Sequence, residues 1–345
     1  MNMSRYILQR LFWMLPTLLL ILVINFLVVQ LAPGGPVGQA LYQAELQQQQ
    51  YAWAYQGQQG LSAEMLAQLE AQYGFGQPIH VRFWQMLCNY AQFDFGTSFF
   101  KDQPVIELIR ERLAVTLSLG LWSTLLIYLI SIPLGMWKAK RHGRAIDHGT
   151  SLLLAAAYAM PAFIFALLLI VLFAGGSYWQ WFPVQGLVSE HFAELTWWQK
   201  IFDYLWHMSL PVVAMTLSGF AGLTFLTKAA FMQQMTQQFV QVARAKGLSE
   251  NQVMFKHMLR NAILVIVAGL PEALLGIVFA GNLLIEILFN LDGIGLLGFE
   301  AIVQRDYPII FATLFLLTLM GLVLRLICDV LYRYLDPRID FVGKH

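Results

Sequence analysis

The chain has 345 residues, of which 58% are hydrophobic and only 12% are charged, and its formal net charge is +1. Charged residues make up about a quarter of a typical soluble domain, so this composition indicates a membrane protein. The near-neutral charge gives no support to a nucleic-acid binder, and the two cysteines, Cys88 and Cys328, have no metal-ligand or disulfide-framework spacing.

Six apolar stretches are long enough to cross a bilayer, which takes about 20 helical residues. Backbone groups in lipid must be hydrogen-bonded within the segment, so each stretch is predicted to be a helix. The first follows Arg5 and Arg10 and is longer than a signal-peptide core, so we expect it to be retained. Pro161 in the third stretch invites a kink. The predicted spans are residues 11–32, 113–137, 148–175, 209–230, 262–286 and 308–330.

The positions of lysine and arginine predict the orientation of these spans. The basic run KAKRHGR (138–144) forms a short loop, and the loop 231–261 on the same side is also basic. Cytoplasmic loops carry the excess of positive charge, so both termini are expected inside the cell. The prediction is an all-α integral membrane protein with the cytoplasmic N-terminus and first span at 1–32, a periplasmic insert at 33–111, and a core with five spans at 112–345.

The two larger outer segments are interpreted as accessories to the spans. The insert contains the breaker cluster PGGP (33–36), a glutamine-rich patch (47–50) and a predicted short amphipathic helix at 61–74. It is too small and interrupted for an independent enzyme domain, so we expect a lid or ledge on the outer mouth. The loop 176–208 is rich in tryptophan, and an interfacial aromatic belt is favoured there over a ligand-stacking role.

The inner loop 231–261 is polar and basic, yet it carries regular helix signals. Apolar residues recur at steps of three and four, which predicts one apolar helical face formed by Met232, Met235, Phe239 and Val242. Gly247 is placed to end that helix in the left-handed conformation. Ser249 and Gln252 form a capping-box pattern that predicts the start of a second helix.

Three interpretations of this loop compete. A helix-turn-helix DNA reader has the same outline, but two close membrane attachments leave it no freedom to lie in a groove. A solvated linker would need no apolar stripe, no glycine stop and no cap. We therefore interpret the loop as a docking element that presents an apolar stripe with basic edges to a cytoplasmic partner.

Polar side chains in the fifth predicted span are costly in lipid and are therefore candidates for function. Four residues fall within about 80° of arc on one helical face, namely Glu272, Phe279, Asn282 and Glu286. This face is expected to look into a translocation path or toward a partner permease. In the alternative, Glu286 hydrates at the outer interface and Glu272 pairs with another helix. The fourth span carries a ridge of small residues suited to close helix packing, formed by Ala214, Ser218 and Gly222.

Several ordered motifs resemble one known family. The segment ARAKGLSENQVMFKHMLRNA (243–262) is similar to the conserved cytoplasmic loop of ABC-importer permeases of the dipeptide/oligopeptide group. The resemblance covers nearly the whole chain, through GQPIHVRFWQMLCNYAQFDFGTSF (76–99) and DVLYRYLDPRID (329–340) among others. The variants APGGP, IEILFNLDGIG (285–295) and DPRIDF are similar to the Yej-type permeases associated with peptide and microcin C uptake. The implied fold is an ABC type I importer permease in the bacterial inner membrane.

The resemblance implies a mechanism that needs several chains. A second, different permease would complete the translocation path, two cytoplasmic ABC ATPase domains would each hold one loop helix, and a periplasmic peptide-binding protein would deliver substrate. This chain has no G-x-x-x-x-G-K-[ST] phosphate loop, so it is expected to bind no cofactor. ATP-Mg would be used by the ATPase partners.

The same resemblance assigns two groups of site residues. The coupling residues are Gln241, Ala243, Arg244, Ala245, Lys246, Gly247, Leu248 and His257. Gln241 departs from the family, which has Glu or Arg at this position. Contact between the loop and the ATPase is therefore expected to depend on packing around Ala243 and Gly247. The outer gate is expected at Asp292, Gly293, Gly295, Arg305 and Asp306.

Two other classes of function fit the sequence less well. An intramembrane enzyme needs a nucleophile and base, or a metal cluster, at membrane depth, and none of the seven histidines lies mid-span. Many ion-coupled secondary carriers have two repeated halves with matching broken helices, which are not evident here. The sequence therefore predicts a non-enzymatic peptide permease surrounded by lipid, with microcin C-like peptides as candidate substrates and an ion-coupled carrier as the alternative.

Overall fold

The computed structural model describes residues 3–31, 77–98, 100–101, 103–175, 178–270, 273–274, 276 and 283–335. Regular structure in these ranges is helical, apart from one bridge between Thr97 and Pro104. The chain divides into two compact units. The first unit is built from the described residues of Met1–Tyr6, Leu113–Leu296 and Met320–His345, and the second from those of Ile7–Arg112 and Leu297–Leu319.

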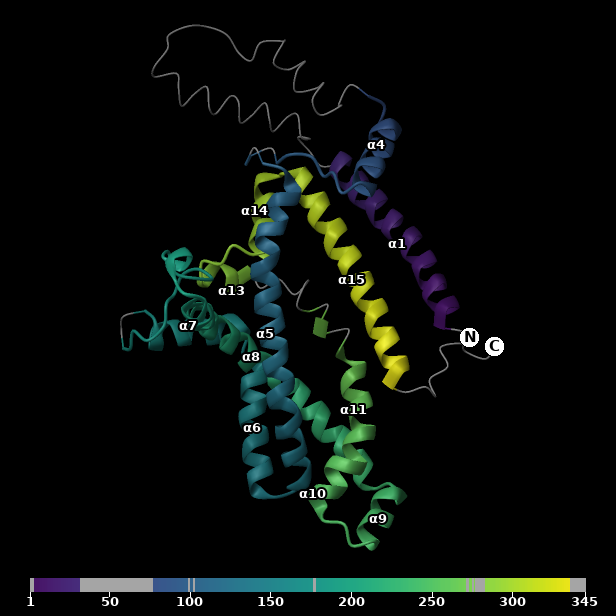
Figure 1. Ribbon diagram of the computed structural model, residues 1–345, viewed down its shortest axis with the longest axis vertical. Helices are drawn as coiled ribbons and strands as arrows, with labels where there is room; N and C mark the ends of the chain where they lie inside the picture. Colours follow the sequence, from purple (N-terminus) through teal and green to yellow (C-terminus); the bar gives the residue numbers. More distant parts are fainter. Residues whose placement is uncertain are drawn as a thin grey trace. The chain divides into compact units, whose positions relative to one another are not determined.

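Four helices in the described ranges are long and apolar enough to cross a membrane (Figure 1). They are α1 (Met3–Leu31), α5 (Val105–Lys140), α8 (Trp197–Met235) and α15 (Tyr307–Leu335). They correspond to the first, second, fourth and sixth predicted spans. At a rise of about 1.5 Å per residue, α5 and α8 are longer than the roughly 30 Å of hydrocarbon in a bilayer.

The third predicted span, 148–175, is broken into two helices. α6 (Ala145–Ala159) and α7 (Ala162–Phe173) meet at an angle of 97°. Met160, between them, has extended backbone with φ of −91° and ψ of 123°, because the ring of Pro161 disfavours the helical conformation in the preceding residue. The expected kink is therefore a sharp break, and the pair makes a fifth span only if both arms are taken together.

The fifth predicted span, 262–286, is described only at its two ends. α11 (Leu259–Ala268) covers its beginning and α13 (Leu283–Leu288) its end. Most of the residues from 271 to 282 lie outside the described ranges. The count of six spans and their orientation therefore stay predictions.

The predicted insert, 33–111, is described mainly from residue 77 onward, so the helix predicted at 61–74 lies outside the described residues. α4 (Ile79–Ala91) follows. Its buried Tyr90 packs edge-on against Phe95, with ring centroids 4.8 Å apart, and against Phe315 of α15 at 5.4 Å. Within the second unit, these aromatic contacts hold the last part of the insert against α15.

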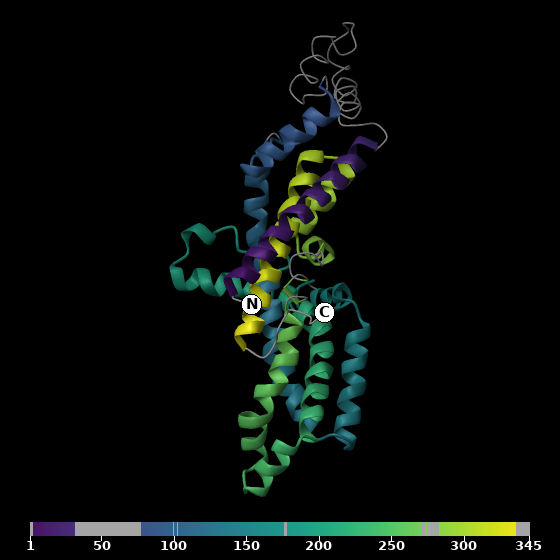
Figure 2. The same cartoon turned by 90° about the vertical axis from the view of Figure 1, so that its right-hand side faces the viewer.

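The first unit has an apolar cluster, called here the inner-end cluster, beneath the inner loop. Figures 1 and 2 show the short helices of that loop, α9 (Gln238–Ala245) and α10 (Glu250–Gln252), at the same end of this unit as the turn between α5 and α6. The cluster is formed by Met136 and Ala139 of α5, Ala230 and Phe231 of α8, and Val240, Ala243, Val253, Met254, Met258 and Ala262 of the loop region.

Candidate docking loop, cavity and outer turn

The docking loop, defined as residues 231–261, contains a helix break that its sequence did not signal. α8 ends at Met235, Thr236 is its C-cap, and α9 starts a separate helix after Gln237. Gln237 has extended backbone, with a ψ of 145°. The extended backbone of Gln237 changes the helical phase, so side chains spaced three and four apart across the break no longer share a face.

The prediction that these four residues form one apolar face is therefore wrong. Met232 and Met235 pack against the inner-end cluster of the chain itself, whereas Phe239 and Val242 are 37% and 52% exposed and so remain available to a partner. Val240 and Ala243 are buried in their place. One face of α9 thus fixes the docking loop to the unit, and the opposite face stays accessible.

The predicted glycine stop and second cap are both confirmed. Gly247 has a φ of +81°, and its amide donates to the Arg244 carbonyl at 2.9 Å. A Cβ added there would meet no atom within 4 Å, so glycine is required by the backbone conformation alone. In the capping box, Ser249 Oγ accepts from the Gln252 amide at 3.4 Å, and Gln252 Oε1 accepts from the Ser249 amide at 3.0 Å.

The second helix is less regular than expected. After α10 the chain forms η2, a π-helix over Val253–Met258, before α11 begins. This wider turn buries Val253, Met254 and Met258 and leaves Phe255 64% exposed. Single π-turns within helices are frequent at functional sites. Phe255 is therefore an accessible aromatic side chain on the docking loop, not part of its internal packing.

The accessible surface of the docking loop combines apolar and charged groups. Its exposed apolar residues are Phe239, Val242 and Phe255. The Arg244 guanidinium donates to the Glu250 carboxylate at 2.8 and 3.1 Å, which links α9 to α10. Of the predicted coupling residues, Gln241, Arg244, Ala245, Lys246 and Gly247 are exposed, Leu248 and His257 are half-buried, and Ala243 is buried. Ala243 therefore packs within the chain and does not present itself to a partner.

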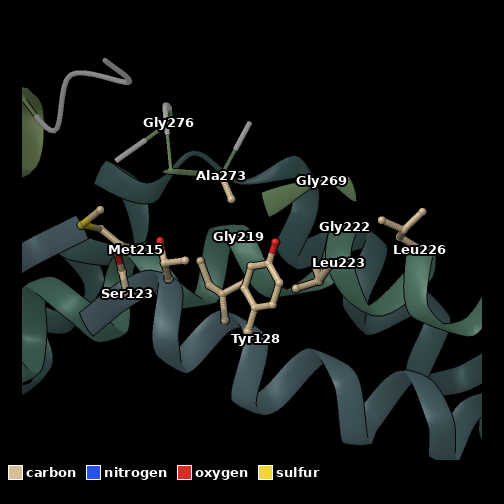
Figure 3. Close-up of a pocket in the computed structure, with 12 residues that line it drawn as sticks. Ser123, Tyr128, Met215, Gly219, Gly222, Leu223, Leu226, Gly269, Ala273 and Gly276 are labelled. Carbon is tan, nitrogen blue, oxygen red and sulfur yellow. The ribbon is translucent and has the colours of Figure 1, made fainter. Parts of the chain in front are cut away.

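A cavity of about 450 Å³ opens between α5, α8 and the segment that follows α11 (Figure 3). Figure 3 shows Tyr128 of α5 and Ala273 on facing sides, with the tyrosine hydroxyl directed toward the α11 segment. Gly219 of α8 also lines the cavity, and a Cβ there would lie 2.5 Å from Cδ1 of Ile127. Of the small-residue ridge noted in the sequence, only Gly222 lines this space.

The lining of this cavity is weakly polar. No charged side chain is among the described residues that form it, and its hydroxyl groups belong to Ser123, Thr124 and Tyr128. Ser123 Oγ donates to the carbonyl of Leu119 in its own helix at 2.6 Å.

Of the four predicted path residues, Glu286 alone falls among the described residues. Glu272, Phe279 and Asn282 lie outside the described residues, so their place on the path stays a prediction. Glu286 is described, is 0% exposed and is not among the residues that line the cavity. Its burial also rules out the alternative that it hydrates at the outer interface.

The Glu286 carboxylate instead caps the start of α14 (Ile294–Gln304). Its Oε2 accepts from the Leu296 amide at 2.7 Å, and its Oε1 accepts from the Thr116 hydroxyl at 3.3 Å. Thr116 Oγ1 in turn accepts from the Ile294 amide at 2.9 Å. The first amides of a helix lack partners within the helix, and its dipole favours a negative charge there. These contacts favour a capping role for Glu286 over a place on the path.

The outer turn, defined as residues 289–293, closes around this carboxylate. A Cβ at Gly293 would overlap the Glu286 carboxyl group, and a Cβ at Gly295 would lie 3.0 Å from its Oε2. Asp292, which lies between Leu291 and Gly293 in the chain, is exposed. The two predicted gate glycines and Glu286 are thus parts of one packed arrangement, a relation that the sequence did not reveal.

The other predicted gate residues, Arg305 and Asp306, lie in the second unit before α15. Asp306 is 1% exposed, and its carboxylate accepts from the Ser98 hydroxyl at 2.5 Å. Ser98 Oγ also accepts from the amide of Lys101 at 3.0 Å, and the Lys101 ammonium pairs with Glu300 at 2.9 Å. The end of the insert is therefore fastened to the turn between α14 and α15. The grouping of all five residues as one gate stays a prediction.

Comparison with known proteins gives concordant similarities. A family model described as binding-protein-dependent transport system inner membrane component matches residues 131–341. The inner membrane ABC transporter permease protein YejB of Escherichia coli O157:H7 is 47% identical, over 99% of this chain and 100% of the relative. The peptidoglycan transport system permease protein YejB of Agrobacterium fabrum is 48% identical, over 98% and 99%. The oligopeptide transport system permease protein AppB of Bacillus subtilis is 34% identical, over 98% and 100%.

One similar solved structure is the MetNI methionine ABC transporter in an inward-facing conformation. The match has a TM-score of 0.52 at 16% sequence identity, and it covers 67% of this chain and 97% of that chain. At this identity the comparison concerns the fold alone. The helical permease fold implied by the sequence motifs is the fold of that structure.

Proposed function

The chain belongs to the family of binding-protein-dependent transport system inner membrane components, and from this premise we propose that it forms half of the translocation path of a peptide importer. The observation that carries the proposal is the similarity over the whole chain to relatives named for peptidoglycan and oligopeptide transport. Both names denote substrates that contain peptides. Short peptides are therefore the proposed substrate class, with microcin C-like peptides among the candidates.

The proposed arrangement has six spans, both termini in the cytoplasm and the insert 33–111 outside. The four long helices and the bent pair α6–α7 supply five of these spans. The docking loop and the basic turn 138–144 lie at one end of the first unit, as a shared cytoplasmic side requires (Figures 1 and 2). A second, different permease completes the path, and a periplasmic peptide-binding protein delivers the peptide to the outer mouth.

The docking loop is the proposed contact with one of two cytoplasmic ABC ATPase domains, and the second permease contacts the other. Its accessible aromatic residues Phe239 and Phe255 and the exposed Val242 offer apolar area for burial. The paired Arg244 and Glu250 stiffen the link between the helices that carry them. ATP-Mg is bound and hydrolysed by those partner domains, and this chain supplies the mechanical connection to the spans.

The cavity lined by Tyr128, Gly219 and Ala273 is the proposed segment of the peptide path in this chain. We expect Ala273→Phe to fill it and to abolish uptake, because the ring occupies the space through which substrate passes. Ala273→Ser, at the same position, adds one atom and is expected to transport normally. Uptake of a labelled peptide into liposomes measures both. Normal uptake by the phenylalanine variant, present at wild-type amount, would exclude this cavity from the path.

Glu272 retains its predicted place on the path. We expect Glu272→Gln to reduce uptake and Glu272→Leu to reduce it further, because an ionisable side chain at membrane depth is costly unless it serves a function. Uptake rates normalised to the amount of assembled complex make this comparison. Wild-type rates in both variants would remove Glu272 from the path.

A reconstitution decides between the importer and the ion-coupled carrier. The chain is co-purified with the products of neighbouring genes, placed in liposomes, and supplied with the binding protein, peptide and ATP. We expect uptake and stimulated ATP hydrolysis that survive collapse of the ion gradient and stop without ATP. Uptake that stops with the gradient and persists without ATP would defeat the proposal in favour of the carrier.

A further inference from the structure

Three charged side chains lie close together near the turn between α5 and α6, at the end of the first unit that also carries the docking loop. Lys138 is in the last turn of α5, Asp147 in the first turn of α6, and Lys228 on α8. Nζ of Lys138 lies 3.0 Å from the Asp147 carboxylate, and Nζ of Lys228 lies 2.7 Å from it. The exposed fractions of these side chains are 0%, 2% and 15% for Lys138, Asp147 and Lys228 respectively. This ion cluster joins three helices.

The polar atoms of the ion cluster are hydrogen-bonded to one another and to neighbouring groups, including the Gly143 amide, which donates to the Asp147 carboxylate at 3.3 Å. Lys138 Nζ donates to the Asp147 carbonyl at 2.9 Å, to Thr150 Oγ1 at 2.6 Å and to Ser151 Oγ at 2.9 Å. Lys228 Nζ donates to both carboxylate oxygens of Asp147, at 2.8 and 2.7 Å. With its three donors used, Lys138 has none left for a ligand. The ion cluster is therefore a connection between helices, not a binding site.

The helix turns that contain Lys138 and Lys228 also pack against residues of the docking loop. Met136 and Ala139, on either side of Lys138 in the sequence, belong to the inner-end cluster, as do two residues that follow Lys228. One turn before Lys138, a Cβ at Gly135 would lie only 2.5 Å from Cβ of Thr227, so α5 and α8 approach closely there. The ends of α5 and α8 thus contact the docking loop through apolar residues and α6 through the ion cluster.

We propose that the ion cluster makes α5, α6 and α8 respond as one body when the docking loop is displaced. Displacement of the loop reaches α5 and α8 through the inner-end cluster, and it reaches the start of α6 through Lys138, Asp147 and Lys228. Asp147 and Lys228 are then positioning residues, which touch neither peptide nor nucleotide. The role in transport rests on the proposed function, whereas the link from ion cluster to docking loop is a property of this chain.

The charges of the ion cluster determine which substitution tests it best. Two ammonium groups share one carboxylate, so removing Asp147 leaves two buried cations without a counter-ion, which is strongly destabilising. Removing the Lys228 ammonium leaves one balanced pair. Lys228→Met is therefore the informative variant, and Lys228→Arg, which keeps a charged donor for Asp147, is its conservative counterpart. Arg144→Met is the matched control, because it removes an exposed charge from the same basic turn.

Hydrogen exchange of the purified complex tests the link without any transport measurement. In Lys228→Met we expect faster exchange in the first turns of α6 and also in α9 and η2 of the docking loop, which the Lys228 side chain does not contact through any hydrogen bond described. Lys228→Arg and Arg144→Met are expected to match the wild type. Faster exchange confined to α6 would overturn the proposal, because it would show a local loss of structure only. If Lys228→Met does not assemble, Lys228→Gln is expected to show the same pattern at smaller size.

The number of peptides imported per ATP hydrolysed tests the consequence. We expect this ratio to fall about fivefold or more in Lys228→Met, the lower end of typical coupling effects between sites. The yield of complex and the basal ATPase are expected to stay at wild-type values. An unchanged ratio would overturn the positioning role. Absence of ATP-driven uptake by the wild type would count against the proposed function alone, since hydrogen exchange would still decide the link.

Discussion

Replacing Gly247 with valine is expected to abolish stimulated peptide uptake while the protein still inserts into the membrane at a normal level. Gly247 has a φ of +81°, a conformation that costs L-residues about 1–2 kcal/mol and β-branched residues more. Because a Cβ there meets open space, the strain is confined to the turn between α9 and α10. A changed turn alters how α9 and η2 are placed relative to each other, and the ATPase would lose a preformed surface.

A substitution series at this position separates backbone strain from other effects. Asparagine tolerates the left-handed conformation, alanine less so and valine least, so uptake is expected to fall in the order Gly, Asn, Ala, Val. Uptake and binding-protein-stimulated ATPase are measured in liposomes with each variant at equal amount. Normal uptake by Gly247→Val would contradict the docking account. Equal loss in the asparagine and valine variants would contradict the backbone explanation.

Replacing Gly293 with alanine is expected to destabilise the protein by about 1–3 kcal/mol, the usual cost of overpacking a well-packed site. The added methyl group would overlap the Glu286 carboxylate, which is itself held by the Leu296 amide and the Thr116 hydroxyl. The outer turn or the cap of α14 would have to move. We expect a lower thermal midpoint of the purified complex and a corresponding loss of uptake.

A double-mutant cycle identifies the cause of that loss. Glu286→Ala removes the carboxylate that the new methyl group would meet, so the double variant is expected to be no less stable than Glu286→Ala alone. Gly298→Ala is the matched control, because a Cβ at this position in α14 meets nothing within 4 Å. It is expected to leave the midpoint unchanged or to raise it, since alanine is the better helix former. Additive losses from Glu286→Ala and Gly293→Ala would show that the two residues do not interact.

The long spans could be predicted because bilayer thickness imposes one length and one composition on every crossing helix. The predicted stretches at 113–137 and 209–230 lie within the longer α5 and α8. Local conformational signals were equally reliable at Gly247 and Ser249, because a left-handed glycine and a capping box act within a few residues. The break at Thr236 was missed because no glycine or proline marks it.

Side chains whose partners are distant in the sequence could not be assigned in this way. Its spacing on the helix places Glu286 among the predicted path residues. Its hydrogen-bond partner Thr116, 170 positions away in the sequence, instead makes it part of a helix cap. Lys138 is predicted as one more cytoplasmic charge of a basic turn, whereas Lys228 and Asp147 make it part of a buried connection. Spacing on a helix says which residues share a face, but not what that face meets.

The sequence by itself therefore determined the membrane class, four of the long helices, the family motifs and the capped turn of the docking loop, because each depends on local composition or on residues close in the chain. Only the tertiary structure decided that Met232 and Met235 pack inside the chain while Phe239 and Val242 stay accessible, that Glu286 closes the outer turn, and that Lys138, Asp147 and Lys228 bind one another. The physical reason is that burial and charge pairing depend on distances in space. Those distances are set by how α5, α6, α8 and α14 pack, which no single segment encodes.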